Sequence, residues 1–195
     1  MNRSGILILL GIVVVLVFFG CNSYNGLVTA DQSVKKTWSN VETNYQRRTD
    51  LYSSVIKTIE GSANFEKSTL REVLEARSKA TSINVDINDP ASLAAYQAAQ
   101  ANLQSSFSKL LAVVEAYPDL KTTTAFRDFQ TQIEGTENRI NIARQDYNKV
   151  VEDYNLKVKR FPNSLFAGIF GYHEKPFYKA DPGSQNAPDI KFDIK

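Results

Sequence analysis

The sequence predicts an all-α protein, in which an N-terminal transmembrane helix leads into an antiparallel bundle of about four long helices and then an extended, aromatic C-terminal tail. Two observations predict this class. An uncharged apolar run occupies Gly5–Cys21, and apolar residues then recur at alternating spacings of three and four, which is the period of a helix face and not of a strand. We therefore divide the chain into an anchor (1–23), a bundle (24–161) and a tail (162–195).

Composition limits the classes of protein and of site. The chain has 195 residues and is 43% hydrophobic, which suits one domain with a real core. Its 23 basic and 21 acidic residues give a net charge of +2, too balanced to predict a nucleic-acid partner. The single cysteine, Cys21, excludes an internal disulfide, and the single histidine, His173, argues against His-pair metal sites and catalytic triads. We expect no cofactor.

The apolar run has about 17 residues, which is at the short end of what spans a bilayer. Phe18 and Phe19 stand where a cleavable signal would need small residues, and this favours a retained anchor in membrane lipid. Two alternatives stay open: a lipoprotein signal, with Cys21 lipidated, and plain secretion. Arg3 before the run favours a cytoplasmic N-terminus, which places the bundle on the outer, periplasmic or extracellular, side of the cell membrane.

The first helix of the bundle follows the anchor without a break. Its seam continues without a slip over about five heptads, through Tyr24, Leu27, Asp31, Val34, Trp38, Val41, Tyr45, Arg48, Tyr52, Val55 and Ile59. At 1.5 Å per residue this helix would be about 55 Å long. Asp31 and Arg48 are charged members of this apolar seam. We interpret them as buried charges that are neutralised by partners and set the helix register, with a groove for a peptide or an acidic ligand as the alternative.

Glycine and proline residues divide the rest of the chain. Gly61 is expected to end the first helix. The later helices are expected from Phe65 to Ala80, from Asp89-Pro90 to Tyr117-Pro118, and from Thr122–Thr124 to Phe161-Pro162. With four helices the last returns to the membrane and the tail begins near lipid. If Gly61 does not break the first helix, three helices remain and the tail is distal.

The beginning of the tail is rich in aromatic residues. One alternative is that these rings dock on the end of the bundle, and the other is that they form a surface patch touching lipid or a protein partner. The residues of this expected tail contact patch are Phe161, Phe166, Phe170 and Tyr172.

Charged residues on the two long helices are expected to face each other in a polar network or partner contact. They are Asp31, Arg47, Arg48, Asp50, Glu134, Glu137, Arg139 and Arg144. A di-iron site would need a Glu-x-x-His motif, and no helix of the predicted bundle contains histidine, so we expect neither metal nor catalytic residues here. Tyr147-Asn148 and Tyr154-Asn155 repeat at seven residues, which indicates packing.

Several spaced motifs resemble the LemA family over residues from Tyr24 to about Tyr178. They are Tyr24-Asn25-Gly26-Leu27-Val28, Trp38, Gln46-Arg47-Arg48-Thr49-Asp50-Leu51, Ala76-Arg77, Glu115-Ala116-Tyr117-Pro118-Asp119-Leu120-Lys121, Glu134-Gly135-Thr136-Glu137-Asn138-Arg139-Ile140, Tyr147-Asn148, Tyr154-Asn155, Arg160-Phe161-Pro162-Asn163 and Phe177-Tyr178. The resemblance implies one N-terminal membrane segment and a domain of long antiparallel helices, without an established activity. Where the family has a proline after its Arg-Arg-Ala-Asp-Leu motif, this chain has Ser53, which predicts a straighter first helix.

These observations favour a non-enzymatic, membrane-anchored scaffold or adapter of the bacterial envelope, with a protein partner or a second copy of the chain as its binding partner. The alternatives are an accessory or regulatory subunit of a membrane enzyme such as a protease or phosphatase, an enzyme with an unrecognised carboxylate site, and a lipoprotein anchored through Cys21.

Overall fold

The computed structural model describes residues 3–60, 67–117 and 124–179. These residues form helices and connecting segments without a strand, which confirms the all-α prediction. The helices are α1 (Arg3–Glu60), α2 (Lys67–Ser82), α3 (Pro90–Val114), α5 (Thr124–Lys159) and α6 (Asn163–Ile169). The helix breaks expected at Gly61 and Pro118 lie outside the described residues.

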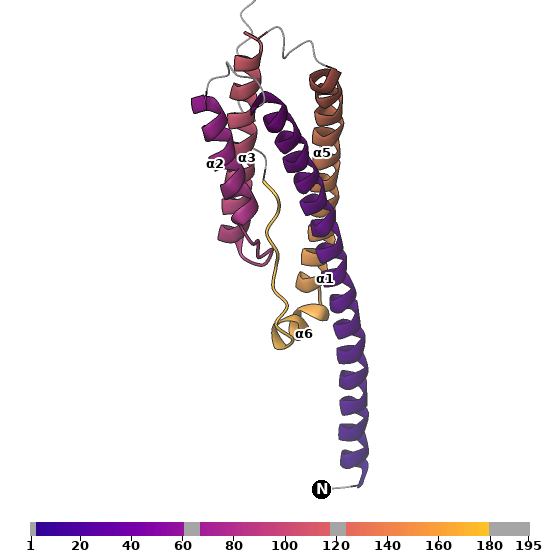
Figure 1. Ribbon diagram of the computed structural model, residues 1–195. Helices are drawn as coiled ribbons and strands as arrows, with labels where there is room; N and C mark the ends of the chain where they lie inside the picture. Colours follow the sequence, from indigo (N-terminus) through magenta and orange to yellow (C-terminus); the bar gives the residue numbers. More distant parts are fainter. Residues whose placement is uncertain (1–2, 61–66, 118–123, 180–195) are drawn as a thin grey trace, which may run out of the picture.

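Helix α1 is continuous over 58 residues, so it would be about 87 Å long at 1.5 Å per residue. The boundary proposed between anchor and bundle at residue 23 falls inside this helix. The described apolar side chains between Ile6 and Phe19 are exposed, and this part of α1 extends beyond the bundle (Figure 1). Among the described helices, α1 is the one that is long and apolar enough to cross a membrane.

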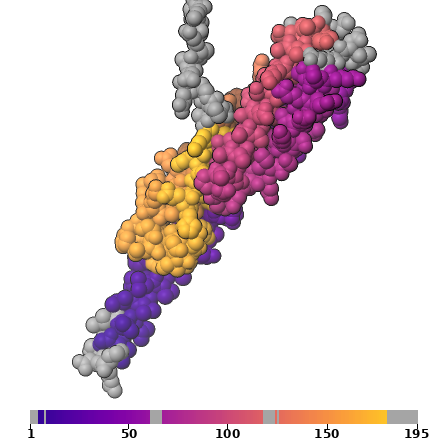
Figure 2. Space-filling model, turned by 90° about the vertical axis from the view of Figure 1, so that its left-hand side faces the viewer, coloured from indigo at the N-terminus to yellow at the C-terminus, as the bar shows by residue number. Residues whose placement is uncertain are grey.

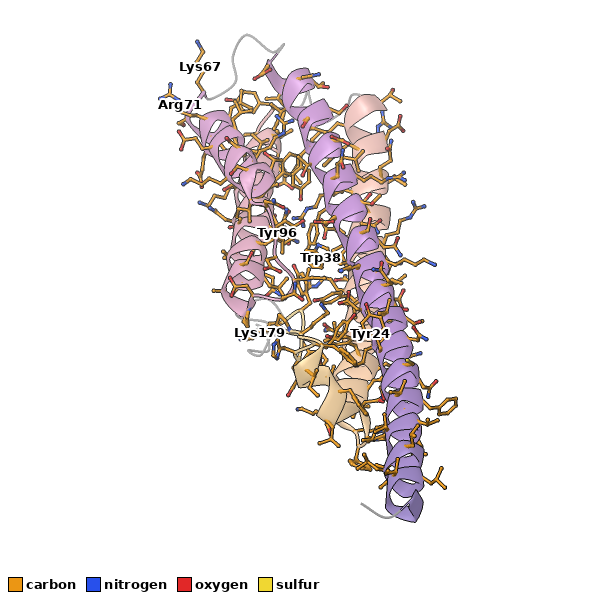
Figure 3. The ribbon with its side chains drawn as sticks, turned by 90° about the horizontal axis from the view of Figure 1, so that it is seen from below. Tyr24, Trp38, Lys67, Arg71, Tyr96 and Lys179 are labelled. Carbon is orange, nitrogen blue, oxygen red and sulfur yellow. The ribbon has the colours of Figure 1, made fainter. Side chains whose placement is uncertain are left out.

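The bundle is built from two helix pairs. Helices α1 and α5 pack along each other, and α2 and α3 form a second pair beside them (Figure 1). The predicted seam of α1 is buried from Leu27 to Ile59, whereas Tyr24 is 45% exposed. Trp38 of α1 and Tyr96 of α3 point toward each other, with ring centroids 5.7 Å apart (Figure 3). The pairs therefore share a core.

Local sequence signals explain where α3 begins. The side chain of Asp89 accepts hydrogen bonds from the backbone N–H groups of Ala91 and Ser92 at 3.0 and 3.1 Å, and Pro90 occupies the first helical position. This is the cap expected from the Asp-Pro pair, because proline has no N–H to leave unpaired there.

The tail differs from the extended chain that the sequence predicted. It begins with the short helix α6, which lies at the end of the bundle from which the apolar part of α1 extends (Figure 1). The chain then reverses at Gly171, where φ is +74°, and continues as an extended segment to Lys179. This extended segment lies at the surface alongside α3 (Figure 2). The short helix packs against α1 and α5 and buries Ala167.

Candidate functional site: a buried polar layer and a clamped tail

A layer of polar side chains crosses the bundle between two apolar clusters. Arg48 of α1 is 2% exposed, and its Nη2 donates to the side-chain Oε1 of Gln100 at 2.7 Å and to the Gln100 backbone oxygen at 3.2 Å. Its Nη1 donates to Oε1 of Glu137 at 3.4 Å. Gln100 lies on α3 and Glu137 on α5, so one guanidinium connects three helices.

Aromatic rings and apolar clusters surround this layer. The guanidinium carbon of Arg48 lies 4.7 Å from the ring centroid of Tyr45 and 5.8 Å from that of Tyr52, within cation–π range. Tyr45 belongs to the cluster nearer the anchor and Tyr52 to the distal cluster. Burial of a charge is costly unless partners surround it, and the position of Arg48 is therefore fixed along the bundle axis.

A second buried ion pair joins the tail to α1. Nζ of Lys175, whose side chain is 3% exposed, lies 2.8 Å from Oδ1 of Asp31, and Nζ of Lys35 lies 2.8 Å from Oδ2. Lys175 also hydrogen-bonds the side chain of Asn88 and lies 5.1 Å from the ring centroid of Tyr154. Burial by itself raises the pKa of Asp31, but the hydrogen bonds and charges of Lys175 and Lys35 hold this pKa below its usual value of 3.8.

The repeated Tyr-Asn pairs of α5 hold the extended segment. Asn155 accepts from the backbone N–H of Lys175 at 2.8 Å and donates to the carbonyl of Lys175 at 2.9 Å. Asn148 does the same for Tyr178, at 2.7 and 2.9 Å. A side-chain amide has the donor and acceptor of a peptide group, so each asparagine supplies what a neighbouring strand would. We call these contacts the tail clamp.

The tyrosines of the repeat complete the tail clamp. The hydroxyl of Tyr154 donates to the carbonyl of His173 at 2.9 Å, and that of Tyr147 donates to the carbonyl of Pro176 at 3.2 Å. Burial raises the pKa of both hydroxyls to about 12, so they stay protonated donors at neutral pH. Seven helical residues span about 10.5 Å and three extended residues span about 10 Å, so one heptad of α5 matches three residues of the tail.

Of the eight expected charged residues, four make contacts inside the bundle or with the tail, and four lie exposed on helix surfaces. The structure brings Arg48 and Glu137 together, and it pairs Asp31 with lysines. Arg144 donates from Nη2 to the carbonyl of Lys179 at 3.1 Å, and its guanidinium carbon lies 4.3 Å from the ring centroid of Tyr178. The remaining members are exposed on helix surfaces and form no ion pair among the described residues: Arg47, Asp50, Glu134 and Arg139.

The residues of the tail contact patch are also divided. The rings of Phe170 and Tyr172 lie edge-to-face with Tyr24 of α1, at 5.1 and 6.5 Å between centroids. Phe166 is half-buried beside Gly20. Phe161 instead is 79% exposed. Phe166, Phe170 and Tyr172 therefore suit docking on the bundle, whereas Phe161 suits a surface patch.

Sequence reasoning missed Gln100 and Lys175. Gln100 stands on the apolar seam of α3, and a polar residue at such a position is the signal that could have identified it as the partner of Arg48. Lys175 lies in a segment without helical periodicity, so its burial at 5% has no local sequence signal.

Hollows also open beside these helices. A polar cavity of about 190 Å³ lies at the layer and is lined by Arg48, Gln100, Glu137, Asn141 and Arg144, among others. A shallow groove of about 280 Å³ lies between α1 and α5, and the 51% exposed side chain of Ile142 lines it. Among the described residues, no three His, Cys, Asp or Glu side chains gather to hold a metal ion. Cys21 is exposed on α1.

An apolar N-terminal helix continued into a helical bundle defines a membrane-associated helical-bundle protein. The model of the LemA family matches residues 37–192. This chain belongs to the LemA family, as its motifs indicated.

Known relatives agree with this assignment. The magnetosome proteins MamQ 1 and MamQ 2 of Paramagnetospirillum magneticum are 25% identical to this chain over 178 residues, an alignment that covers 82% of this chain and 65% of each relative. Protein LemA of Metamycoplasma hominis is 26% identical over 156 residues, covering 80% of this chain and 68% of the relative. The chain thus spans about 65% of the length of the MamQ proteins.

Replacing Arg48 tests the polar layer. Arg48→Ala is expected to lower the free energy of unfolding by about 3 kcal/mol, because it leaves a cavity and unpaired buried groups. The adjacent Arg47→Ala removes an exposed arginine and is expected to change it by less than about 0.5 kcal/mol. Urea unfolding of the full chain in detergent micelles, followed by circular dichroism, measures both. Equal effects of the two substitutions would contradict a structural role for Arg48.

The tail clamp predicts a local effect of its asparagines. Asn148→Ala with Asn155→Ala is expected to raise hydrogen exchange at the amides of Lys175 and Tyr178 roughly tenfold or more, because both N–H groups lose their acceptors. Asn141→Ala is the matched control, since Asn141 stands one heptad before Asn148 and is exposed. Unchanged exchange in the double variant would refute the clamp.

The Asp31–Lys175 pair predicts sensitivity to acid. The pKa of Asp31 is lower in the folded protein than in the unfolded chain, so its contribution is present above about pH 4 and is lost as the pH falls through the folded-state pKa. Asp31→Asn is expected to make the free energy of unfolding fall less between pH 5 and pH 2. Urea titrations across this range measure it, and parallel curves for the two proteins would count against the pair.

Proposed function

We propose that this protein is a non-enzymatic, membrane-anchored scaffold or adapter of the bacterial envelope. The continuity of α1 carries this proposal, because one helix of 58 residues joins the apolar run to the bundle without a flexible linker. A bundle attached in this way keeps a defined direction relative to the bilayer. A bundle that is attached rigidly in this way can present a binding surface in a set direction, which a domain on a flexible linker cannot do.

The buried charged groups support a role without catalysis. The guanidinium of Arg48 is held by Gln100 and Glu137, and the carboxylate of Asp31 by two lysines. Charged groups that already hold one another are suited to fixing helix register, whereas a catalytic acid or base must meet a substrate. The family relatives carry names that describe no reaction.

The groove between α1 and α5 is the surface that we propose for a protein partner or a second copy of the chain. Ile142 is half exposed there among polar neighbours such as Asn40, Asn44 and Asp146. An apolar side chain within a polar rim is typical of a transient protein interface. Arg3 before the apolar run supports a bundle, and with it this groove, on the outer side of the cell membrane.

Crosslinking in intact membranes tests the proposal. A photo-crosslinking residue at Ile142 is expected to capture one specific non-enzyme protein or a second copy of the chain, whereas the same residue at Leu74 on α2, 38% exposed, is the control and should capture none. Mass spectrometry identifies the product. Recovery of a membrane protease or phosphatase would favour an accessory subunit instead, and equal products from both positions would refute the groove.

A further inference from the structure

The end of the bundle nearest the apolar run carries a row of exposed apolar side chains. Phe161, Leu165 and Ile169 are 79%, 60% and 77% exposed. Leu165 and Ile169 stand four residues apart on α6, which places them on one face of this helix. Within the described part of the chain, no large apolar side chain is more exposed than Phe161 and Ile169. We call these three residues the α6 face.

The opposite side of α6 is fixed to α1. Ala167 is 2% exposed, and the ring of Phe166 lies 3.4 Å from where a Cβ at Gly20 would stand. Oγ of Ser23 donates to Oδ1 of Asn163 at 2.8 Å, and Tyr24 contacts Phe170 edge-to-face. These contacts attach α6 to α1 between residues 20 and 24, so the exposed side chains cannot turn inward.

The dimensions of a bilayer place this attachment at the membrane boundary. A hydrocarbon core of about 30 Å requires about 20 helical residues. A span that begins at Gly5 therefore ends near Tyr24, at the level where α6 is attached (Figure 1). The uncharged apolar run itself ends at Cys21 and is about 17 residues long, which is short for this thickness.

We propose that the α6 face inserts into the leaflet boundary at which α1 leaves the bilayer, and that it is a second lipid contact of the bundle. Apolar side chains at this depth replace water contact with contact to acyl chains. The neighbouring groups suit the same boundary: Tyr24 and Tyr172 can lie at headgroup level, and the exposed Arg160 can reach lipid phosphates.

This second contact has a consequence for orientation. A single continuous helix sets the direction in which the bundle extends from the bilayer, but it leaves the bundle free to rotate about the helix axis. Insertion of the α6 face at one side of α1 selects the rotation that brings this side toward the lipid. The inference rests on the proposed membrane anchoring, and it adds which side of the bundle faces the bilayer.

Spin labelling of the full chain in phosphatidylcholine and phosphatidylglycerol vesicles tests the proposal. In a Cys21→Ser background, Leu165→Cys and Ile169→Cys are labelled with a nitroxide, and Leu74→Cys on α2 and Phe177→Cys on the extended segment are matched apolar controls. The α6 labels are expected to collide more with oxygen than with a water-soluble nickel complex, at a depth of about 5–10 Å. The control labels are expected to show the reverse.

Flotation of the same vesicles separates the two proposals. A chain that floats with labels at residues 165 and 169 resembling the controls refutes the lipid contact and leaves the anchor intact. Labels at residues 165 and 169 that are shielded from both reagents would mean that protein covers the α6 face, which also refutes lipid insertion. A chain that does not float refutes the anchor and the lipid contact together.

Discussion

The burial of Arg48 is the constraint on which the arrangement of the bundle depends. A heptad seam alone is degenerate, because sliding one helix by seven residues again sets apolar side chains against apolar ones. Sliding α1 in this way would place a guanidinium in one of the apolar clusters without partners, at a cost of several kcal/mol, on the order of 3–5. One register brings Arg48 to Gln100 and Glu137, and the clusters on either side then pack around it.

The tail makes further specific contacts with α5 and α1, on the side of the polar layer that faces the membrane anchor. In its extended segment the backbone groups of Lys175 and Tyr178 pair with asparagine side chains of α5. This pairing is possible because one heptad of α5 and three extended residues have nearly the same length. The buried Asp31–Lys175 pair adds a link to α1. The extended segment thus joins the two long helices, and α6, which precedes it in the tail, is held against α1 at the proposed bilayer boundary.

These features give the family fold a physical interpretation. The LemA match and the apolar helix describe a membrane-associated protein. In this chain Asp31, Arg48, Glu137 and Arg144 make contacts inside the bundle or with the tail, and we propose that these contacts fix the helix register and hold the extended segment. The α1–α5 groove and the α6 face are the surfaces that we propose for recognition. The first suits a protein partner, and the second suits lipid.

The sequence by itself determined the helices of the bundle, although not α6 in the tail, because the signals of the longer helices are local. Apolar residues spaced by three and four predicted the buried seam of α1, and Asp89-Pro90 predicted the start of α3. It also identified Arg48 and Asp31 as the charged exceptions. Only the tertiary structure decided their partners, because Gln100 and Lys175 are 52 and 144 positions away and nothing local marks a contact at that distance. The same holds for the Tyr-Asn repeat. Its period indicated packing, while the tail clamp depends on a segment that folds back and runs antiparallel along α5.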